Sequence, residues 1–479
     1  HGGDCKYVMD VQLKKQYNIG WVGNVETGGG TKQRYLARLF AMRFTDHSRL
    51  AVYGNMNNLN DDRKPGENDN WSPSDLFGGL TQQQLGGLDY NIDARSGKYK
   101  LSGNAQVRHA DNTIVNNTNR TNFLANGDTY DRMVANNRNH NFTLSTDHQF
   151  YFEFKNANLN IKPRFNYQYY NNKSGYSSLT LNRSFTSFSK AQLDSLYTPM
   201  IGRELIRTAI NRNLRNGLSI GHSLEGSVSM ESLIKFKYSP DHITLYADAS
   251  LRHATEDSFD RNRIDYYTNG QQSNTDFRNR YFNNRPDHGY SMTGKVTYSY
   301  LVKRGLFFDF SYKYNRTTSN RYSSLYRLDQ LADWGINSER ELGTLPSVDA
   351  YNRVMDIHNS YDSRQTDNTH TLGAFLVWNK KTTKSEWWAQ LVPNLSLLSR
   401  TMHYHSGNVD TTFTKRSILY NMYSTFIRWR STDHKYEFMF QYHVNGQAPD
   451  MNLFVNILNT TDPLNVTMGN TNLKPSYKH

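Results

Sequence analysis

The chain has 479 residues, of which 36% are hydrophobic, and a formal net charge of +13. It contains no run of about 18 apolar residues, which excludes a membrane-spanning helix, and its single cysteine excludes an internal disulfide framework. The 33 Tyr, 24 Phe and 7 Trp, against only 11 Pro, exclude an intrinsically disordered chain.

Segments that alternate apolar and polar residues recur along the chain. In HITLYADASLRH (242–253), every second residue from Ile243 to Leu251 is apolar. This alternation predicts a β-strand with one apolar and one polar face. About fifteen such strands are predicted in chain order, at 19–29, 34–44, 48–58, 87–95, 98–109, 140–154, 159–170, 232–239, 242–253, 292–300, 305–316, 371–378, 386–398, 418–429 and 435–444.

Short and long connections alternate between these strands. GGGT (28–31) is interpreted as a hairpin turn, and further short turns, rich in Gly, Pro, Asn, Asp and Ser, are predicted at 45–48, 95–98, 155–158, 239–242, 302–305, 379–384 and 431–434. Long polar loops are predicted at 58–85, 110–138, 172–224, 254–288, 316–369 and 405–413, and from Asn445 onward. This asymmetry is typical of outer-membrane barrels, whose short turns face the periplasm and whose long loops face outward.

Two segments inside the long loops have helical spacing of apolar residues. GRELIRTAINRNLR (202–215) and SSLYRLDQLADW (323–334) are predicted to form amphipathic helices that cover the mouth of the sheet. The alternative is that both are structured loops with no role in binding.

Tryptophans gather near the predicted short turns. Because indole rings prefer the membrane interface, these residues are predicted to form a girdle on the periplasmic side. Ordinary aromatic packing at strand ends is the alternative. The predicted girdle residues are Trp21, Trp378, Trp387, Trp388 and Trp429.

The apolar face of the strands is predicted to contact lipid. A soluble sandwich would fill that face with Val, Ile, Leu and Phe, but here Tyr, Ala, Gly and Met are frequent. Strands of about ten residues match the length that crosses a bilayer when tilted, and closure removes the exposed sheet edges that lipid does not tolerate. The predicted fold is therefore all-β, a transmembrane antiparallel up-and-down β-barrel in the cell outer membrane.

Two motifs resemble a known family, the TonB-dependent-receptor-like outer-membrane barrel proteins of the Bacteroidota. The first is a glycine-rich "GW-GN-E-G-GT--RY" run followed by "G--NN-N". GNTNLKPSY (469–477) is similar to the family's "NPNLKPE" segment, with Thr471 for Pro and Ser476 for Glu. The matching residues of the first motif are Gly20, Trp21, Gly23, Asn24, Glu26, Gly28, Gly30, Thr31, Arg34, Tyr35, Gly54, Asn57 and Asn58.

The resemblance implies a barrel of about 22 strands around an N-terminal plug. Residues 1–18, which include YVMDVQLKK (7–15), are then expected to be the end of the plug, and 19–479 a barrel that is incomplete at its C-terminus. The resemblance also implies import of a bulky nutrient, such as a glycan, a peptide or a metal chelate, driven by an inner-membrane motor. A surface lipoprotein lid or other outer-membrane subunits are the implied protein partners.

The positive charge has two interpretations, nucleic acid or the anionic headgroups of outer-membrane lipid and lipopolysaccharide. The basic residues are dispersed and no nucleic-acid-binding motif occurs, so lipid is the predicted partner and nucleic acid is not.

Features with apparent chemistry do not form a site. His403 and His405 share one face of a strand, but two ligands leave a metal site incomplete. The acidic loop KPGENDNWSPSD (64–75) lacks the ligand spacing of a calcium loop. No nucleophile, paired carboxylate or phosphate-binding motif is present, so no enzyme activity, metal or cofactor is predicted, and the residues that bind substrate are not identified.

The sequence is compatible with several functions. The first is a TonB-dependent-receptor-like importer, and the second is a non-transporting structural barrel subunit of a larger outer-membrane assembly or secretion complex. A passive porin is a third, and an adhesin or enzyme barrel a fourth.

Overall fold

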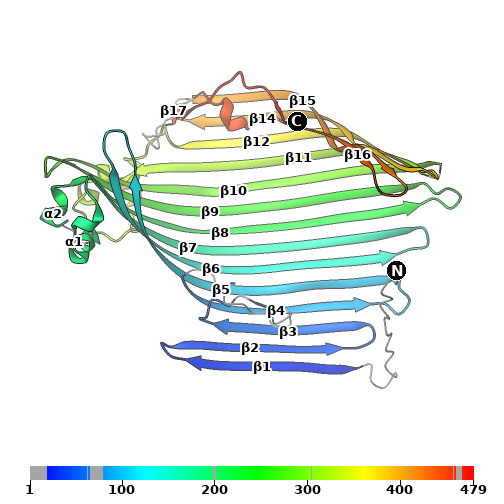
Figure 1. Cartoon of the computed structure of the whole chain (residues 1–479), viewed down its shortest axis with the longest axis horizontal. Helices are drawn as coiled ribbons and strands as arrows, with labels where there is room; N and C mark the ends of the chain where they lie inside the picture. Colours follow the sequence, from blue (N-terminus) through cyan, green and yellow to red (C-terminus); the bar gives the residue numbers. More distant parts are fainter. Residues whose placement is uncertain are drawn as a thin grey trace.

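The computed structural model describes residues 19–61, 63–64, 79–197, 201–303, 305–407, 409–456, 458–459 and 467–478. Most of them form one sheet of 17 strands (Figure 1). The strands are β1 Gly20–Gly30, β2 Arg34–Phe44, β3 Ser48–Asn57, β4 Leu80–Asp93, β5 Tyr99–Asn122, β6 Thr129–Glu153, β7 Ala157–Leu181, β8 Ala209–Lys235, β9 His242–Thr268, β10 Gln271–Lys303, β11 Leu306–Arg327, β12 Tyr361–Lys381, β13 Ser385–Leu391, β14 Pro393–Ser406, β15 Val409–Ser431, β16 Glu437–Gln447 and β19 Ser476–Lys478. The short pair β17 Leu458–Asn459 and β18 Thr467–Met468 lies apart from this sheet.

The strands form an up-and-down meander. From β1 to β12 each strand pairs antiparallel with the next one along the chain. β13 and β14, separated by Val392, together fill one place between β12 and β15. β16 follows β15 and also pairs with β19. The predicted all-β, antiparallel, up-and-down fold is confirmed, and every predicted strand is present, although 386–398 is split in two.

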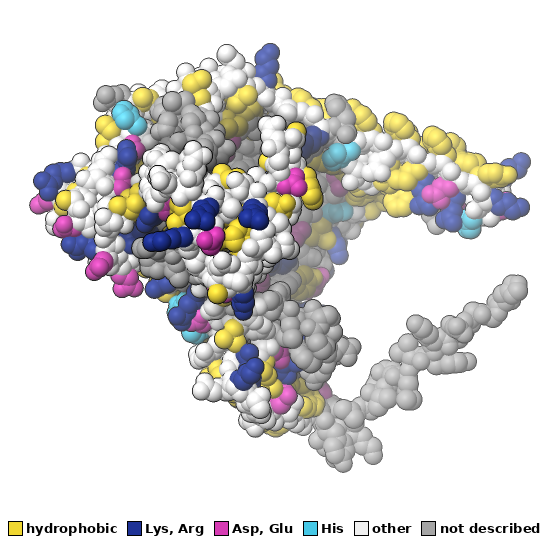
Figure 2. All heavy atoms as spheres, turned by 60° about the vertical axis from the view of Figure 1, so that its left-hand side comes forward, with side chains coloured by type: hydrophobic (Ala, Val, Ile, Leu, Met, Phe, Trp, Pro, Cys, Tyr) yellow, Lys and Arg dark blue, Asp and Glu magenta, His cyan; other side chains and the backbone are white. Residues whose placement is uncertain are grey.

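The sheet is curved like the wall of a barrel. In the view of Figure 2 it bends around a hollow that is open on one side. Within the described residues β1 pairs only with β2, and no pairing joins β1 to β16 or β19. Closure into a complete barrel, the number of strands in it and the plug therefore stay predictions, and residues 1–18 lie outside the described part of the chain.

Most short turns are found where they were predicted, but Gly28, Gly29 and Gly30 of GGGT still belong to β1, so that turn begins only at Thr31. The turn after GGG places Lys32 and Gln33 at φ of 57° and 59°, which reverses the chain between β1 and β2. In the turn between β4 and β5, Gly97 has φ of 68°, a conformation that costs glycine little.

The predicted long loops are largely wrong, because most of their residues extend the strands. β5 and β6 continue to Asn122 and back from Thr129, and β9 and β10 are joined by only Asn269 and Gly270. The strands from β5 to β12 accordingly have 21 to 33 residues, far more than predicted. Beyond the apolar segments polar residues predominate on both faces, so regular hydrophobic alternation is lost there, although the backbone pairing continues.

The two predicted helices are also largely wrong. Within 202–215 only α2 (Arg203–Ile206) is helical, and β8 begins at Ala209. In 323–334, β11 continues to Arg327 and two single 3-10 turns follow. In both segments some apolar residues belong to a strand and others to a single helical turn, so their spacing does not reflect one continuous helix. Among the described residues, no helix is long and apolar enough to cross a membrane.

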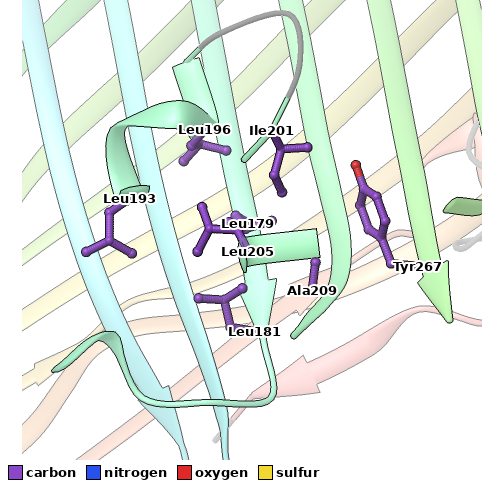
Figure 3. Close-up of a cluster of buried hydrophobic side chains, with 8 residues drawn as sticks. All are labelled: Leu179, Leu181, Leu193, Leu196, Ile201, Leu205, Ala209 and Tyr267. Atoms are coloured by element: carbon purple, nitrogen blue, oxygen red, sulfur yellow. The ribbon is translucent and has the colours of Figure 1, made fainter. Parts of the chain in front are cut away.

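Two true loops, at 182–208 and 328–360, fold back over the sheet. In the first, Leu193 and Leu205 on α1 (Lys190–Asp194) and α2 pack on Leu179 and Leu181 of β7 (Figure 3). A capping box between Ser189 and Gln192 fixes the start of α1. The second loop includes α3 (Val348–Asn352), and its Leu328 and Trp334 pack with Phe259, Tyr281 and Tyr326 of the strands.

Candidate functional site

The pairing register assigns each described strand residue to one of two faces. Directly opposite residues of antiparallel strands lie on the same face. The alternating residues Ile243 to Leu251 of β9 lie opposite Tyr298 to Tyr290 of β10 and Ile234 to Gly226 of β8. We call the face that these residues share the apolar face. The polar face carries the intervening residues, such as Thr244, Asp248 and Arg252.

A band of exposed hydrophobic side chains crosses the apolar face. It lies on the half of each strand nearest the short turns, and we call it the apolar band. A continuous apolar surface of this size is rare on soluble proteins and marks contact with another molecule or with lipid. Figure 2 shows hydrophobic side chains in rows along the projecting part of the sheet. Exposed members on β1 to β5, β8 to β12 and β14 to β16 include Val25, Leu39, Val52, Leu88, Val107, Met230, Leu245, Val296, Phe310, Leu372, Leu397, Ile418 and Phe440.

Four of the five predicted girdle tryptophans lie on the apolar face. Trp387 of β13 is directly opposite Trp429 of β15, with ring centroids 6.5 Å apart, and its ring is 6.4 Å from that of Trp378. Trp21 lies opposite Arg43 at the same end of the sheet and is 73% exposed. Trp388 is on the polar face instead, opposite Asn379 and Arg428, with its ring 5.6 Å from Phe426.

A hollow lies on the polar face, at the middle of the sheet. It has a volume of about 720 Å³ and extends from β5 to β11. Hydroxyl groups of Ser145, Ser227 and Ser250 line it, together with two cross-strand ion pairs. The pairs are Asp147 with Arg164, 2.8 Å apart, and Glu225 with Arg252, 3.5 Å apart.

These ion pairs are half exposed to solvent, so they add little to stability. Their charged groups are available to a polar ligand, and the neighbouring hydroxyls both donate and accept hydrogen bonds. The arrangement suits a hydrated, hydrogen-bonding ligand. Sequence reasoning missed this hollow because its residues come from separate strands and form no motif.

The asparagines of the "G--NN-N" motif have a structural role. Asn57 is fully buried on the polar face, and its amide donates to the carbonyl oxygen of Asp61 at 2.7 Å and to Asn55 at 2.8 Å. Asn58 accepts a hydrogen bond from the backbone N–H of Tyr35 at 2.9 Å. The motif therefore folds the segment after β3 back onto the sheet.

Arg38 of β2 joins this cluster by ion pairs with Glu26 and Asp61. Asp61 also pairs with Arg63 at 2.9 Å. A second polar hollow of about 400 Å³ begins beside this cluster, where Arg108 donates to Gln83 at 3.0 Å.

The histidine pair noted in the sequence and the described part of the acidic loop line neither hollow. His403 and His405 both approach Asp410, at 3.6 and 4.0 Å, on an exposed hairpin. Apart from Lys64, which pairs with Asp89, almost all of the acidic loop 64–75 lies outside the described residues. Among the residues that the structure describes, no group of three or more His, Cys, Asp or Glu side chains is arranged to hold a metal. Of the second family-like segment, Ser476 and Tyr477 lie in β19.

Comparison of the chain with protein-family models finds no match, and comparison with curated proteins finds none either.

Proposed function

We propose that this chain is the wall of an outer-membrane barrel that resembles the TonB-dependent receptors and imports a bulky nutrient, such as a glycan, a peptide or a chelate. The observation that carries the proposal is the exposed apolar band on one face of the sheet, with a polar hollow on the other. This is the pattern of a barrel with lipid outside and a hydrated interior. Transport of a bulky molecule would require an inner-membrane motor as the partner.

The polar hollow supports a polar cargo. Its serines, together with carboxylate and guanidinium groups on neighbouring strands, offer the hydrogen-bond donors and acceptors that sugars and peptide groups need. A passive pore needs only a hydrated wall, so measured conductance through planar bilayers without any bound cargo would contradict import. Stoichiometric purification with other outer-membrane proteins, without any nutrient uptake, would favour a structural subunit instead.

The membrane location is tested with bromine-labelled phospholipids, which quench tryptophan fluorescence on contact. In vesicles of brominated phosphatidylcholine we expect quenching of the wild-type protein. Trp387→Phe should lower the amount of emission that bromine quenches because Trp387 lies on the apolar face, whereas the matched variant Trp388→Phe should leave that amount unchanged because Trp388 lies on the polar face. Absence of quenching, or equal effects of the two variants, would contradict the proposed location.

A further inference from the structure

A row of histidines marks the edge of the apolar band that is farther from the short turns. It consists of His109, His140, His222, His253, His288 and His370, all on the apolar face of different strands. Neighbouring rings are close, with centroids 4.6 Å apart for His109 and His140 and 5.6 Å for His253 and His288. Tyr169 and Tyr314 fill the row on β7 and β11, where their rings approach His140 and His370.

The histidine row lies where side chains with both apolar and polar parts are expected, at the boundary of the apolar band. Imidazole and phenol rings combine an apolar body with a polar tip, and such side chains prefer the boundary between apolar and aqueous surroundings. With tryptophans at the opposite edge, the apolar band is bounded on both sides by rings of this kind. If the band contacts lipid, as proposed above, the histidine row lies at the level of the lipid headgroups.

A basic hollow opens on the apolar face one step beyond the row. It has a volume of about 250 Å³ and is lined by Arg138, His140, Tyr169, Asn171 and Lys173. Arg138 of β6 and Lys173 of β7 are directly opposite each other in the register. Two like charges at such a position repel each other, so the site favours an anion between them.

One carboxylate already fixes part of this hollow. Asp111 of β5 accepts hydrogen bonds from Nε and Nη2 of Arg138, at 3.2 and 2.6 Å, and lies 4.0 Å from Nδ1 of His140. These contacts orient the guanidinium, while Lys173 has no acidic partner among the described residues. Arg138, Lys173 and Asp111 together leave an excess positive charge at the headgroup level.

We propose that this hollow binds the phosphate group of an anionic lipid in the outer leaflet, with Arg138 and Lys173 as the main ligands. Guanidinium and ammonium groups at headgroup depth are well suited to phosphate oxygens. Asn171 supplies an amide donor, and the Tyr169 ring forms the side of the hollow nearest the acyl chains. The inference rests on the membrane location proposed above and adds a specific lipid site to it.

The test uses the purified full-length protein in detergent and native mass spectrometry. The probe is bis-phosphorylated lipid A, with its dephosphorylated form and inorganic phosphate as separate arms. We expect wild type to retain the phosphorylated lipid, and Arg138→Gln/Lys173→Gln to bind it about tenfold more weakly or worse. Arg95→Gln/Lys98→Gln, with the same loss of charge in the β4–β5 turn at the other end of the sheet, should bind it as wild type does.

Each outcome either supports or overturns the proposed lipid site. Equal retention by wild type and the Arg138/Lys173 variant overturns the site, as does equal binding of the dephosphorylated lipid. Binding of inorganic phosphate alone with equal affinity would assign the hollow to a soluble ion and overturn the lipid proposal. Insertion of wild type and the two variants into vesicles is measured in parallel. If all three insert but retain the phosphorylated lipid equally, only the lipid site is overturned. If the protein stays soluble and monodisperse without detergent, the membrane location itself is overturned.

Discussion

Leu251 and Phe259 lie on the same face of the same strand, eight residues apart, but their surroundings differ completely. Leu251 is 65% exposed, whereas Phe259 is 4% exposed, beneath the loop at 328–360. A weaker form of this contrast occurs on β7, where Ile161 and Phe165 are partly exposed, whereas Leu179 and Leu181 are fully buried beneath the loop at 182–208. On this face the chain covers its apolar residues at one end of the sheet and leaves them exposed at the other.

The difference indicates that the two ends face different surroundings. Exposed apolar surface is unfavourable in water, by about 25 cal/mol per Å². The chain uses two loops to remove that surface beyond the histidine row, which is what a protein does where water is the solvent. No described loop covers the apolar band. This supports our proposal that lipid covers it.

The covered end is expected to show the larger response to loss of a side chain. Leu179→Ala removes a side chain with no exposed surface and leaves a cavity, so it should destabilise the packing of loop 182–208 by about 2–5 kcal/mol. The matched change Leu251→Ala should cost only about 1–2 kcal/mol, because mobile lipid fills the space. Hydrogen exchange of each segment in vesicles measures both effects, and a larger cost for Leu251→Ala would contradict the comparison.

A charge in the band tests its lipid contact directly. Val296→Arg places a guanidinium near the middle of the apolar band and should destabilise the vesicle-bound protein by about 2–4 kcal/mol. Thr297→Arg, the next residue on β10, points to the polar face and should have a much smaller effect. Denaturant titration in vesicles measures both. If the two variants are equally stable, the apolar face is not in hydrocarbon.

How well the sequence predicted this fold depends on which part of a strand is considered. Where one face is apolar, as from Ile243 to Leu251, alternation located the strand and its faces correctly. From Thr255 to Thr268 polar residues predominate on both faces and Phe259 is isolated among them, so the extension of β9 left no regular hydrophobic alternation and was predicted as loop. Backbone hydrogen bonds hold these extensions together. Because backbone groups are the same for every residue type, these bonds leave no pattern in the sequence.

The candidate site was predicted even less completely. Proximity to the predicted short turns selected the girdle tryptophans, but the polar-face position of Trp388 followed only from its pairing with Asn379 and Arg428. The polar hollow and the Arg138–Lys173 pair depend on the register between strands far apart in the sequence. One local signal was present and missed, the Ser189–Gln192 capping box that begins α1.

The polar face of the covered end is held by hydrogen bonds rather than by packing, and one carboxylate is central to it. Asp131 of β6 accepts hydrogen bonds from Arg120 at 2.7 Å, Asn122 at 2.8 Å and Thr180 at 2.8 Å, and so ties β5, β6 and β7 together. Burial by itself would raise the pKa of Asp131, but these donors lower it below its ordinary value. A lowered carboxyl pKa contributes stability above the unfolded-state value, about 3.9, and this contribution is lost as pH falls through the folded-state pKa.

We therefore expect the end of the β5–β6 hairpin to lose protection as the pH falls below about 4, while the apolar band, which contains few charges, keeps its protection. In Asp131→Asn the hairpin should be less protected at neutral pH and should show a smaller further loss in acid, since the side chain at position 131 can no longer be protonated. The nearby Arg132–Asp194 pair, 2.9 Å apart, is intact in both proteins and its effect cancels in the comparison. Hydrogen exchange corrected for the intrinsic effect of pH measures the difference, and identical pH profiles for the two proteins would show that Asp131 does not hold this end of the sheet.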